Sequence, residues 1–297
     1  MSVIPLVLPD FLLVALGWAL LHLLGFDRRF FVNAERLVYF VLFPALLFHS
    51  ITRSPLSLGS ASTLLAAAVA IMACGIGLAW LARPVLRPDP ASHASLAQCG
   101  FRFNTYIGLS IAGGMHLAGA QSVMAVIVGF AVPISNIAAV HALASRNGGR
   151  ALAAIARNPF ILATVLALIC NFLAVPIPDA LNVALGRLGQ SGIVIGLLCV
   201  GATLSLKGGR QHAPLIGWMV AAKLLVLPLC ALLIGPALGL SVMEQQVLLL
   251  FSALPTSSSA HVLAAQMGGN GPLVAMTMSV GTILSALTIP MWLALVF

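Results

Sequence analysis

The sequence predicts an all-α membrane protein of ten transmembrane helices, and three observations support this. Of the 297 residues, 61% are hydrophobic and only 7% are charged, against roughly 25% charged in an ordinary soluble domain. The apolar residues form runs of about 20, the length that a helix needs to cross the hydrocarbon core of a bilayer. No hydrophilic stretch is long enough to form a separate soluble domain.

The spans follow in order from the apolar runs and from the Gly, Pro and charged residues between them. The first run lacks a positive n-region and a small-residue cleavage site, so we expect a retained helix and not a signal peptide. Polar residues interrupt the fourth and ninth spans near Asn104 and Pro255. The ten expected spans are 5–24, 36–53, 59–83, 92–116, 120–143, 153–174, 186–206, 214–236, 243–266 and 271–296.

Basic residues predict the orientation of these spans. With the N-terminus outside, the outer loops hold only Arg53 and Arg187. The cytoplasmic loops then hold Arg28, Arg29, Arg36, Arg83, Arg87, Arg146, Arg150, Arg157, Lys207 and Arg210. The positive-inside rule therefore predicts a multi-pass protein of the cell (inner or plasma) membrane with both termini on the non-cytoplasmic side.

Ten spans divide into two halves of five, residues 1–143 and 144–297. Because each half has an odd number of spans, the halves insert with opposite orientation, as inverted repeats do in many transporters. The interrupted span is the fourth in each half. Discontinuous helices at matching positions are the best sequence indication of a binding site at the membrane midplane.

The fourth span carries the first candidate site, in the segment CGFRFNTYIG. Arg102 is costly inside a bilayer unless it faces a cavity or a partner, and Asn104 and Thr105 add hydrogen-bonding groups beside it. A helix break here would expose amides that can hold a carboxylate. In the alternative interpretation, Arg102 extends from a helix end to the lipid headgroups.

The ninth span carries the second candidate site, in the segment LPTSSSAH. Pro255 removes a backbone donor and breaks the helix. Hydroxyl groups can satisfy the freed backbone groups, but four in succession exceed what a kink requires. We therefore expect a substrate site formed by Pro255, Thr256, Ser257, Ser258, Ser259 and His261.

Two further residues are candidates for coupling or gating. His49 in the second span faces either a cavity or the outer membrane surface. Lys223 lies deep in the eighth span, where a charge is a functional candidate. The five cysteines all fall in apolar spans without C-x-x-C spacing, so neither a disulfide framework nor a metal site is indicated, and no cofactor is expected.

The positions of the acidic residues favour an anionic substrate. Asp10, Asp27, Glu35, Asp89, Asp179 and Glu244 are all expected near span ends or in loops. A cavity with basic and neutral polar groups and no acid suits a small organic anion. The net charge of +8 is scattered between the spans, which argues against nucleic-acid binding.

Absent motifs narrow the class further. The chain lacks a G-x-x-x-x-G-K-[ST] loop and the H-E-x-x-H and G-x-S-x-G motifs, so ATP hydrolysis and known hydrolase chemistry are not indicated. We expect a transporter and not an enzyme. The alternatives are a membrane-embedded enzyme that uses a serine and His261, or a channel or sensor.

An ordered set of segments resembles the auxin efflux carrier family over nearly the whole chain: FPALLFHSI, FRFNTYIGLSI, NPFILATVLAL, KLLVLPL and LPTSSSAHVLAAQMGG. The resemblance implies two inverted five-helix repeats whose broken fourth and ninth helices cross, with Asn104 and Pro255 at the crossing and Thr256 to Ser259 lining the site. It also implies elevator-like transport, often in a homodimer, of malonate or other carboxylates. The third span lacks the acid of some plant members, which leaves the coupling ion open.

Overall fold

The structure is a computed structural model that describes residues 4–53, 58–143, 159–206 and 209–296. Within these ranges every regular element is a helix, as the sequence predicts. Arg146, Arg150, Arg157 and Lys207, four of the basic residues counted above, lie outside the described residues.

Seven of the described helices are long and apolar enough to cross a membrane. They are Pro5–His22, Arg28–Thr52, Ser62–Leu86, Ala120–Leu143, Asp179–Thr203, Ala213–Ala237 and Gly271–Leu293. Two shorter apolar helices, Leu162–Phe172 and Val242–Ala253, accompany them. Composition and helix length therefore agree on a multi-pass membrane protein.

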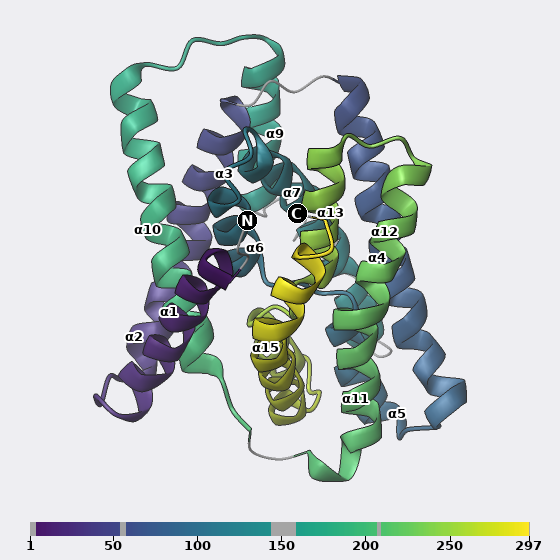
Figure 1. Ribbon diagram of the computed structural model, residues 1–297. Coiled ribbons are helices and arrows are strands. Elements are labelled where there is room, and N and C mark those ends of the chain that lie inside the picture. Colours follow the sequence, from purple (N-terminus) through teal and green to yellow (C-terminus); the bar gives the residue numbers. More distant parts are fainter. Residues whose placement is uncertain (1–3, 54–57, 144–158, 207–208, 297) are drawn as a thin grey trace.

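The helices form two bundles, which we call the first and second bundle. The first lies at the left of Figure 1, and its helices α1, α2 and α3 all pack on α10. Gly17 and Gly201 bring the backbones of α1 and α10 together, because neither position has room for a Cβ atom. The first bundle comprises α1 (Ile4–His22), α2 (Arg28–Leu37), the π-helix η1 (Val38–Leu42), α3 (Phe43–Thr52), α9 (Pro159–Phe172) and α10 (Asp179–Thr203).

The second bundle fills the centre and right of Figure 1. In it α4 packs on α7 and α12, and α12 packs on α13. It comprises α4 (Leu58–Leu86), α5 (Pro90–Leu96), the 3-10 helix η2 (Ala97–Gly100), α6 (Thr105–Gly114), α7 (Ala120–Leu143), the 3-10 helix η3 (Arg210–His212), α11 (Ala213–Ala221), the π-helix η4 (Ala222–Val226), α12 (Leu227–Ala237), α13 (Val242–Ala253), α14 (Ser259–Gln266) and α15 (Gly271–Leu293).

Both π-helices end shortly before a proline. Pro44 and Pro228 are the second residues of α3 and α12. A proline has no N–H, and its ring clashes with the carbonyl four residues earlier. The wider π turn accommodates the proline without ending the helix, so each span continues past its proline as Arg28–Thr52 and Ala213–Ala237.

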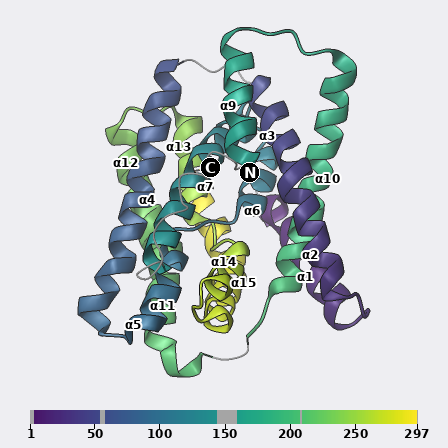
Figure 2. The ribbon, with the colours of Figure 1, turned by 180° about the vertical axis from the view of Figure 1, so that it is seen from behind.

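The connections between helices lie at two opposite ends of the molecule (Figures 1 and 2). The α1–α2 turn, the start of α5 and η3 share one end, and the α9–α10 and α12–α13 connections share the other. Buried apolar side chains join the bundles between these ends, including Leu46, Ile107, Val126 and Leu250. The broken helices α5–α6 and α13–α14 belong to this interior.

Two expected span boundaries were wrong. Helix α2 begins at Arg28 and not at residue 36, because Asp27 caps it by accepting a hydrogen bond from the Arg29 amide at 3.1 Å. Helix α10 begins at Asp179 and not at residue 186. Arg28, Arg29, Arg36 and Arg187 therefore lie on helices and not in loops.

Candidate functional site

The first helix break lies between Gly100, where η2 ends, and Thr105, where α6 begins. Asn104 occupies the N-cap of α6 in an extended conformation. Its side-chain oxygen accepts hydrogen bonds from the amides of Tyr106 at 3.0 Å and Ile107 at 3.3 Å. Asparagine is among the preferred N-cap residues for this reason, so the start of α6 is satisfied by its own chain.

The second helix break lies between Ala253 and Ser259. Leu254 is extended and Pro255 follows it, which ends α13. Ser258 occupies the N-cap position of α14, but its side chain makes no capping hydrogen bond. The two breaks therefore begin their second half-helices in different ways.

The two breaks meet through their backbones. The Asn104 amide donates to the Pro255 carbonyl at 2.8 Å, and the Thr256 hydroxyl donates to the Cys99 carbonyl at 2.9 Å. A Cβ atom on Gly108 would lie 2.7 Å from Cδ1 of Leu254, so glycine permits the close approach. These bonds satisfy backbone groups that the interrupted helices leave without partners.

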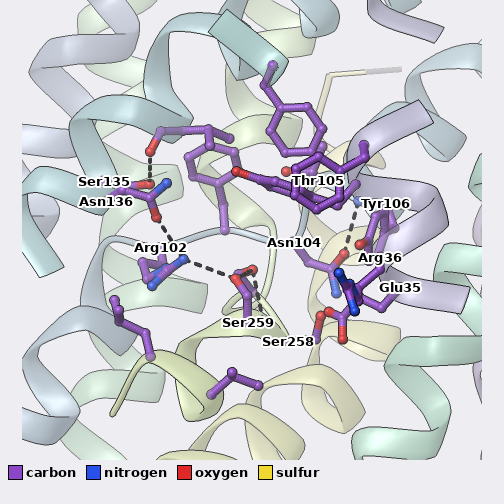
Figure 3. Close-up of a pocket in the computed structure, with 18 of the residues that line it drawn as sticks. Glu35, Arg36, Arg102, Asn104, Thr105, Tyr106, Ser135, Asn136, Ser258 and Ser259 are labelled. Carbon is purple, nitrogen blue, oxygen red and sulfur yellow. Dashed lines mark hydrogen bonds between the residues drawn. The ribbon is translucent and has the colours of Figure 1, made fainter. Parts of the chain in front are cut away.

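A cavity of about 670 Å³ opens beside this crossing. Its walls come from α2 and η1 of the first bundle and from the starts of α6 and α14 and one face of α7 in the second (Figure 3). The first turn of α9 also contributes. The polar lining residues are Glu35, Arg36, Tyr39, Arg102, Asn104, Thr105, Tyr106, Ser135, Asn136, Ser257, Ser258 and Ser259.

Arg102 provides the buried positive charge of the cavity, with 7% of its surface exposed. Its Nη1 donates to Gln98 Oε1 at 3.1 Å. Its Nη2 donates to Asn136 Oδ1 at 2.9 Å and to Ser259 Oγ at 3.0 Å (Figure 3). Its Nε is buried and has no hydrogen-bond partner among the described residues. Arg102 faces the cavity and does not extend to the headgroups.

The serines of the second break face the same space. Ser257, Ser258 and Ser259 line the cavity, and the Ser257 and Ser259 hydroxyls lie 2.9 Å apart. Arg102 therefore joins the first break to the start of α14 through Ser259. The Ser257 hydroxyl also accepts a long hydrogen bond, 3.4 Å, from the Ser259 amide. The arrangement combines a guanidinium, hydroxyl groups and a weakly capped helix start, which together suit an anion.

The other predicted site residues lie around the cavity and not in its lining. The Pro255 carbonyl and the Thr256 hydroxyl hold the crossing. Nδ1 of His261 donates to the Ser258 carbonyl. Nζ of Lys223 is buried and donates to the Ser252 carbonyl at 3.3 Å. His49 lines a separate cavity at the other end of the first bundle.

Several lining residues were missed by the sequence interpretation. Glu35, Arg36 and Tyr39 form the first-bundle wall, and Glu35 hydrogen-bonds to the Ser258 side chain. The available signal was Asp27 followed by RRFFVNAERL, a capped helix start with apolar residues on one face. Asn136 was missed because its partner Arg102 is 34 residues away in the chain.

The expectation of an interior without acids was wrong. Glu35 lines the cavity, and Asp10 is buried in α1 with 6% of its surface exposed. Oδ1 of Asp10 accepts a hydrogen bond from the Ser110 hydroxyl at 2.6 Å, while Oδ2 is buried and has no partner within the part of the chain that the structure describes. Asp10 is close to the chain start in sequence, but the packing of α1 against α6 and α10 covers it.

Comparison with known proteins identifies the class. A family described as membrane transport protein matches residues 146–293. A protein of Rhizobium meliloti (strain 1021) named "Putative malonate transporter" is 26% identical over 301 residues, covering 96% of this chain and 92% of that protein. "Uncharacterized transporter YfdV" of Escherichia coli (strain K12) is 27% identical over 143 residues, covering 48% of this chain and 45% of that protein. These matches confirm the resemblance found in the sequence: the chain is similar to membrane transport proteins, which points to a transporter and not to an enzyme.

Proposed function

We propose that the protein is a secondary transporter that binds a small organic anion in the cavity beside the helix crossing. The observation that carries the proposal is the meeting of the weakly capped α14 start with three serines and the buried Arg102 guanidinium. Helix N-termini attract anions, and hydrogen bonds from a guanidinium to a carboxylate are about twice as strong as neutral ones.

The charges of the lining support a carboxylate as cargo. Arg36 and Arg102 contribute two guanidinium groups, and Glu35 contributes one carboxylate. A cavity with a net positive charge raises the local concentration of an anion above its concentration in bulk water. The name of the Rhizobium relative refers to malonate, so malonate and related carboxylates are the first anions to test.

We also propose ten transmembrane helices in two inverted repeats, residues 1–143 and 144–297. In support, the broken pairs α5–α6 and α13–α14 occupy the same position in each half. The first bundle takes the first two helical segments of each half, and the second bundle takes the other three. This division suits an elevator mechanism, in which the second bundle carries the cargo past the first.

Orientation and assembly belong to the same proposal. Arg28 and Arg29 start α2 and Arg83 ends α4 at one end of the molecule, and Arg53 ends α3 at the other. This distribution favours both termini on the non-cytoplasmic side. The homodimer that the family resemblance implies stays a prediction.

A thermal-shift screen of organic anions against the purified protein tests the proposal. An anion at 100 times its Kd raises stability by about 2.7 kcal/mol. The best anion is then offered, radiolabelled, to reconstituted vesicles. Uptake above empty vesicles supports transport. If no carboxylate stabilises the protein and none is taken up faster than in empty vesicles, the proposed function is wrong.

A further inference from the structure

A second cavity, of about 910 Å³, lies between the end of α3 and the first turns of α10. It belongs entirely to the first bundle and shares no lining residue with the cavity beside the crossing. Figure 1 shows α3 and the upper part of α10 side by side at the end where α10 begins. We call this cavity the outer groove.

The outer groove gathers basic residues from distant parts of the sequence. Arg53 and Arg187, the two basic residues predicted for the outer side, both line it. Asp179 is the one carboxylate in its lining. The ion pair found among the described residues joins His212 to Asp89. Neither arginine of the groove therefore forms an ion pair with another described residue.

Arg187 lies within α10 and not at its end. It is eight residues from the start of the helix, which is about 12 Å along a helix that rises 1.5 Å per residue. Arg187, Gln190 and Ser191 are exposed. Polar side chains on the surface of a membrane helix are costly unless a polar partner meets them. A polar occupant of the groove would meet the side chains of Arg187 and Gln190.

His49 and Asn182 add further polar groups to the lining of the groove. Their side chains interact with each other, so the two arginines remain the groups that a ligand of the groove would satisfy.

We propose that the outer groove binds the phosphate of an anionic phospholipid headgroup. Two guanidinium groups can each donate two hydrogen bonds to phosphate oxygens, with Gln190 as a further donor. Arg53 ends α3, which places it at the membrane surface, where headgroups lie. Val183 and Val194, both exposed in the lining, give the acyl chains an apolar surface. The inference requires membrane embedding and is independent of the cargo.

Native mass spectrometry and thermal melting of the purified full-length protein test the inference. We expect phosphatidylglycerol to remain bound and to raise Tm, and phosphatidylcholine to do so less. The double variant Arg53→Gln/Arg187→Gln should bind phosphatidylglycerol about tenfold more weakly. The control Arg29→Gln/Arg83→Gln removes two charges from the opposite end and should bind it as wild type does.

Three results would overturn the inference. Equal retention of phosphatidylglycerol by wild type and the groove variant would show that the arginines do not hold it. Equal stabilisation by inorganic phosphate at the same concentration would identify a soluble anion as the ligand. If the groove variant instead loses a dimer, with no change in lipid retention, the groove is an interface between two copies of the chain.

Discussion

The two helix breaks occupy equivalent places in the two halves of the chain but differ in chemistry. At the first break, the Asn104 side chain satisfies the first amides of α6. At the second, Ser258 makes no capping hydrogen bond, and the Ser259 amide donates to the Ser257 hydroxyl at 3.4 Å. Similar backbone architecture therefore produces one strongly capped and one weakly capped helix start. A ligand competes more easily for the weakly capped start, because the bond that it would replace is long.

The first break contributes a charged side chain to the cavity, because Asn104 already caps the start of α6. Arg102 lies two residues before Asn104, and its Nη2 reaches Ser259 at the start of α14. One half of the molecule thus supplies the cation and the other supplies the helix start. The comparison indicates that an anion would be held mainly on the α14 side of the cavity.

The largest expected effect is that of Arg102→Gln. The change removes the guanidinium and leaves Asn136 and Ser259 without their donor. Loss of one partner from a buried charged contact costs about 2–5 kcal/mol, so anion affinity should fall at least about thirtyfold. Calorimetric titration with the anion found by screening measures this.

Arg102→Lys is the matched control, because it keeps the charge but loses the planar fork. We expect an affinity between those of wild type and Arg102→Gln. If Arg102→Gln binds the anion as tightly as the wild type does, anion binding does not depend on the charge at the first break.

The next effect compares the two N-cap positions directly. Asn104→Ala removes the cap of α6 and should lower the free energy of unfolding by about 1 kcal/mol. Ser258→Ala removes a hydroxyl that caps nothing but hydrogen-bonds to Glu35. Its cost, about 1 kcal/mol, should therefore be smaller in a Glu35→Ala background, whereas the cost of Asn104→Ala should not change. Thermal melting without anion checks all variants. Equal losses of Tm for the two substitutions in the Glu35→Ala background would contradict the proposed difference between the breaks.

A smaller effect is expected from Glu35→Gln. Glu35 is the one carboxylate in the lining of the cavity, and its charge opposes an anion there. Removal of this charge should raise anion affinity by about threefold, which corresponds to less than 1 kcal/mol. The effect is small because the Glu35 side chain is partly exposed. Titration at low and at high salt measures the gain, which should shrink at high salt. Asp179→Asn, at the separate outer groove, is the control and should leave anion affinity unchanged.

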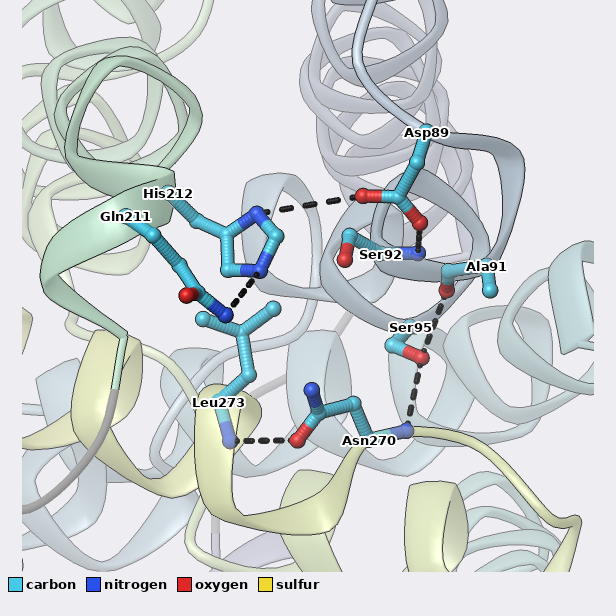
Figure 4. Close-up of polar contacts among 8 residues, drawn as sticks. All are labelled: Asp89, Ala91, Ser92, Ser95, Gln211, His212, Asn270 and Leu273. Atoms are coloured by element: carbon cyan, nitrogen blue, oxygen red, sulfur yellow. Dashed lines mark hydrogen bonds and ion pairs between the residues drawn. The ribbon is translucent and has the colours of Figure 1, made fainter.

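The smallest effect concerns a polar cluster far from both breaks (Figure 4). Oδ1 of Asp89 accepts from the Ser92 amide at 2.8 Å, and its Oδ2 lies 3.8 Å from Nδ1 of His212. The hydrogen bond from the Ser92 backbone, followed by that from the Ser92 side chain, lowers the pKa of Asp89 from its ordinary value of 3.8. A lowered pKa stabilises the fold above pH 3.8, and this contribution is lost as the pH falls through the lower folded value.

Asp89→Asn keeps an acceptor at this cap but removes the charge. We therefore expect the wild type to exceed the variant slightly in Tm at pH 7, and the difference to shrink below pH 3.8. Melting curves between pH 7 and pH 3 measure it. Anion affinity should not change, and a change would mean that this cluster communicates with the crossing.

The sequence predicted the apolar helices and the interruptions at Asn104 and Pro255, because hydropathy, proline and N-cap chemistry are local properties. It did not predict the cavity wall of Glu35 and Tyr39. Glu35 lies just before the expected start of the span at residue 36, and Tyr39 lies within that span, where no local feature marks a side chain that faces a cavity. Nor could it predict the burial of Asp10, which depends on how α1 packs on α6 and α10.

The backbone bonds of the crossing have a consequence for biosynthesis. Thr256 and Cys99 are 157 residues apart in the chain, and the Asn104 amide finds its acceptor at Pro255. A membrane offers no water to satisfy such groups in the meantime. After the first half is inserted, its broken helix therefore lacks these hydrogen-bond partners until the ninth span is synthesised and inserted. A fragment that ends before Pro255 would keep these backbone groups without their partners.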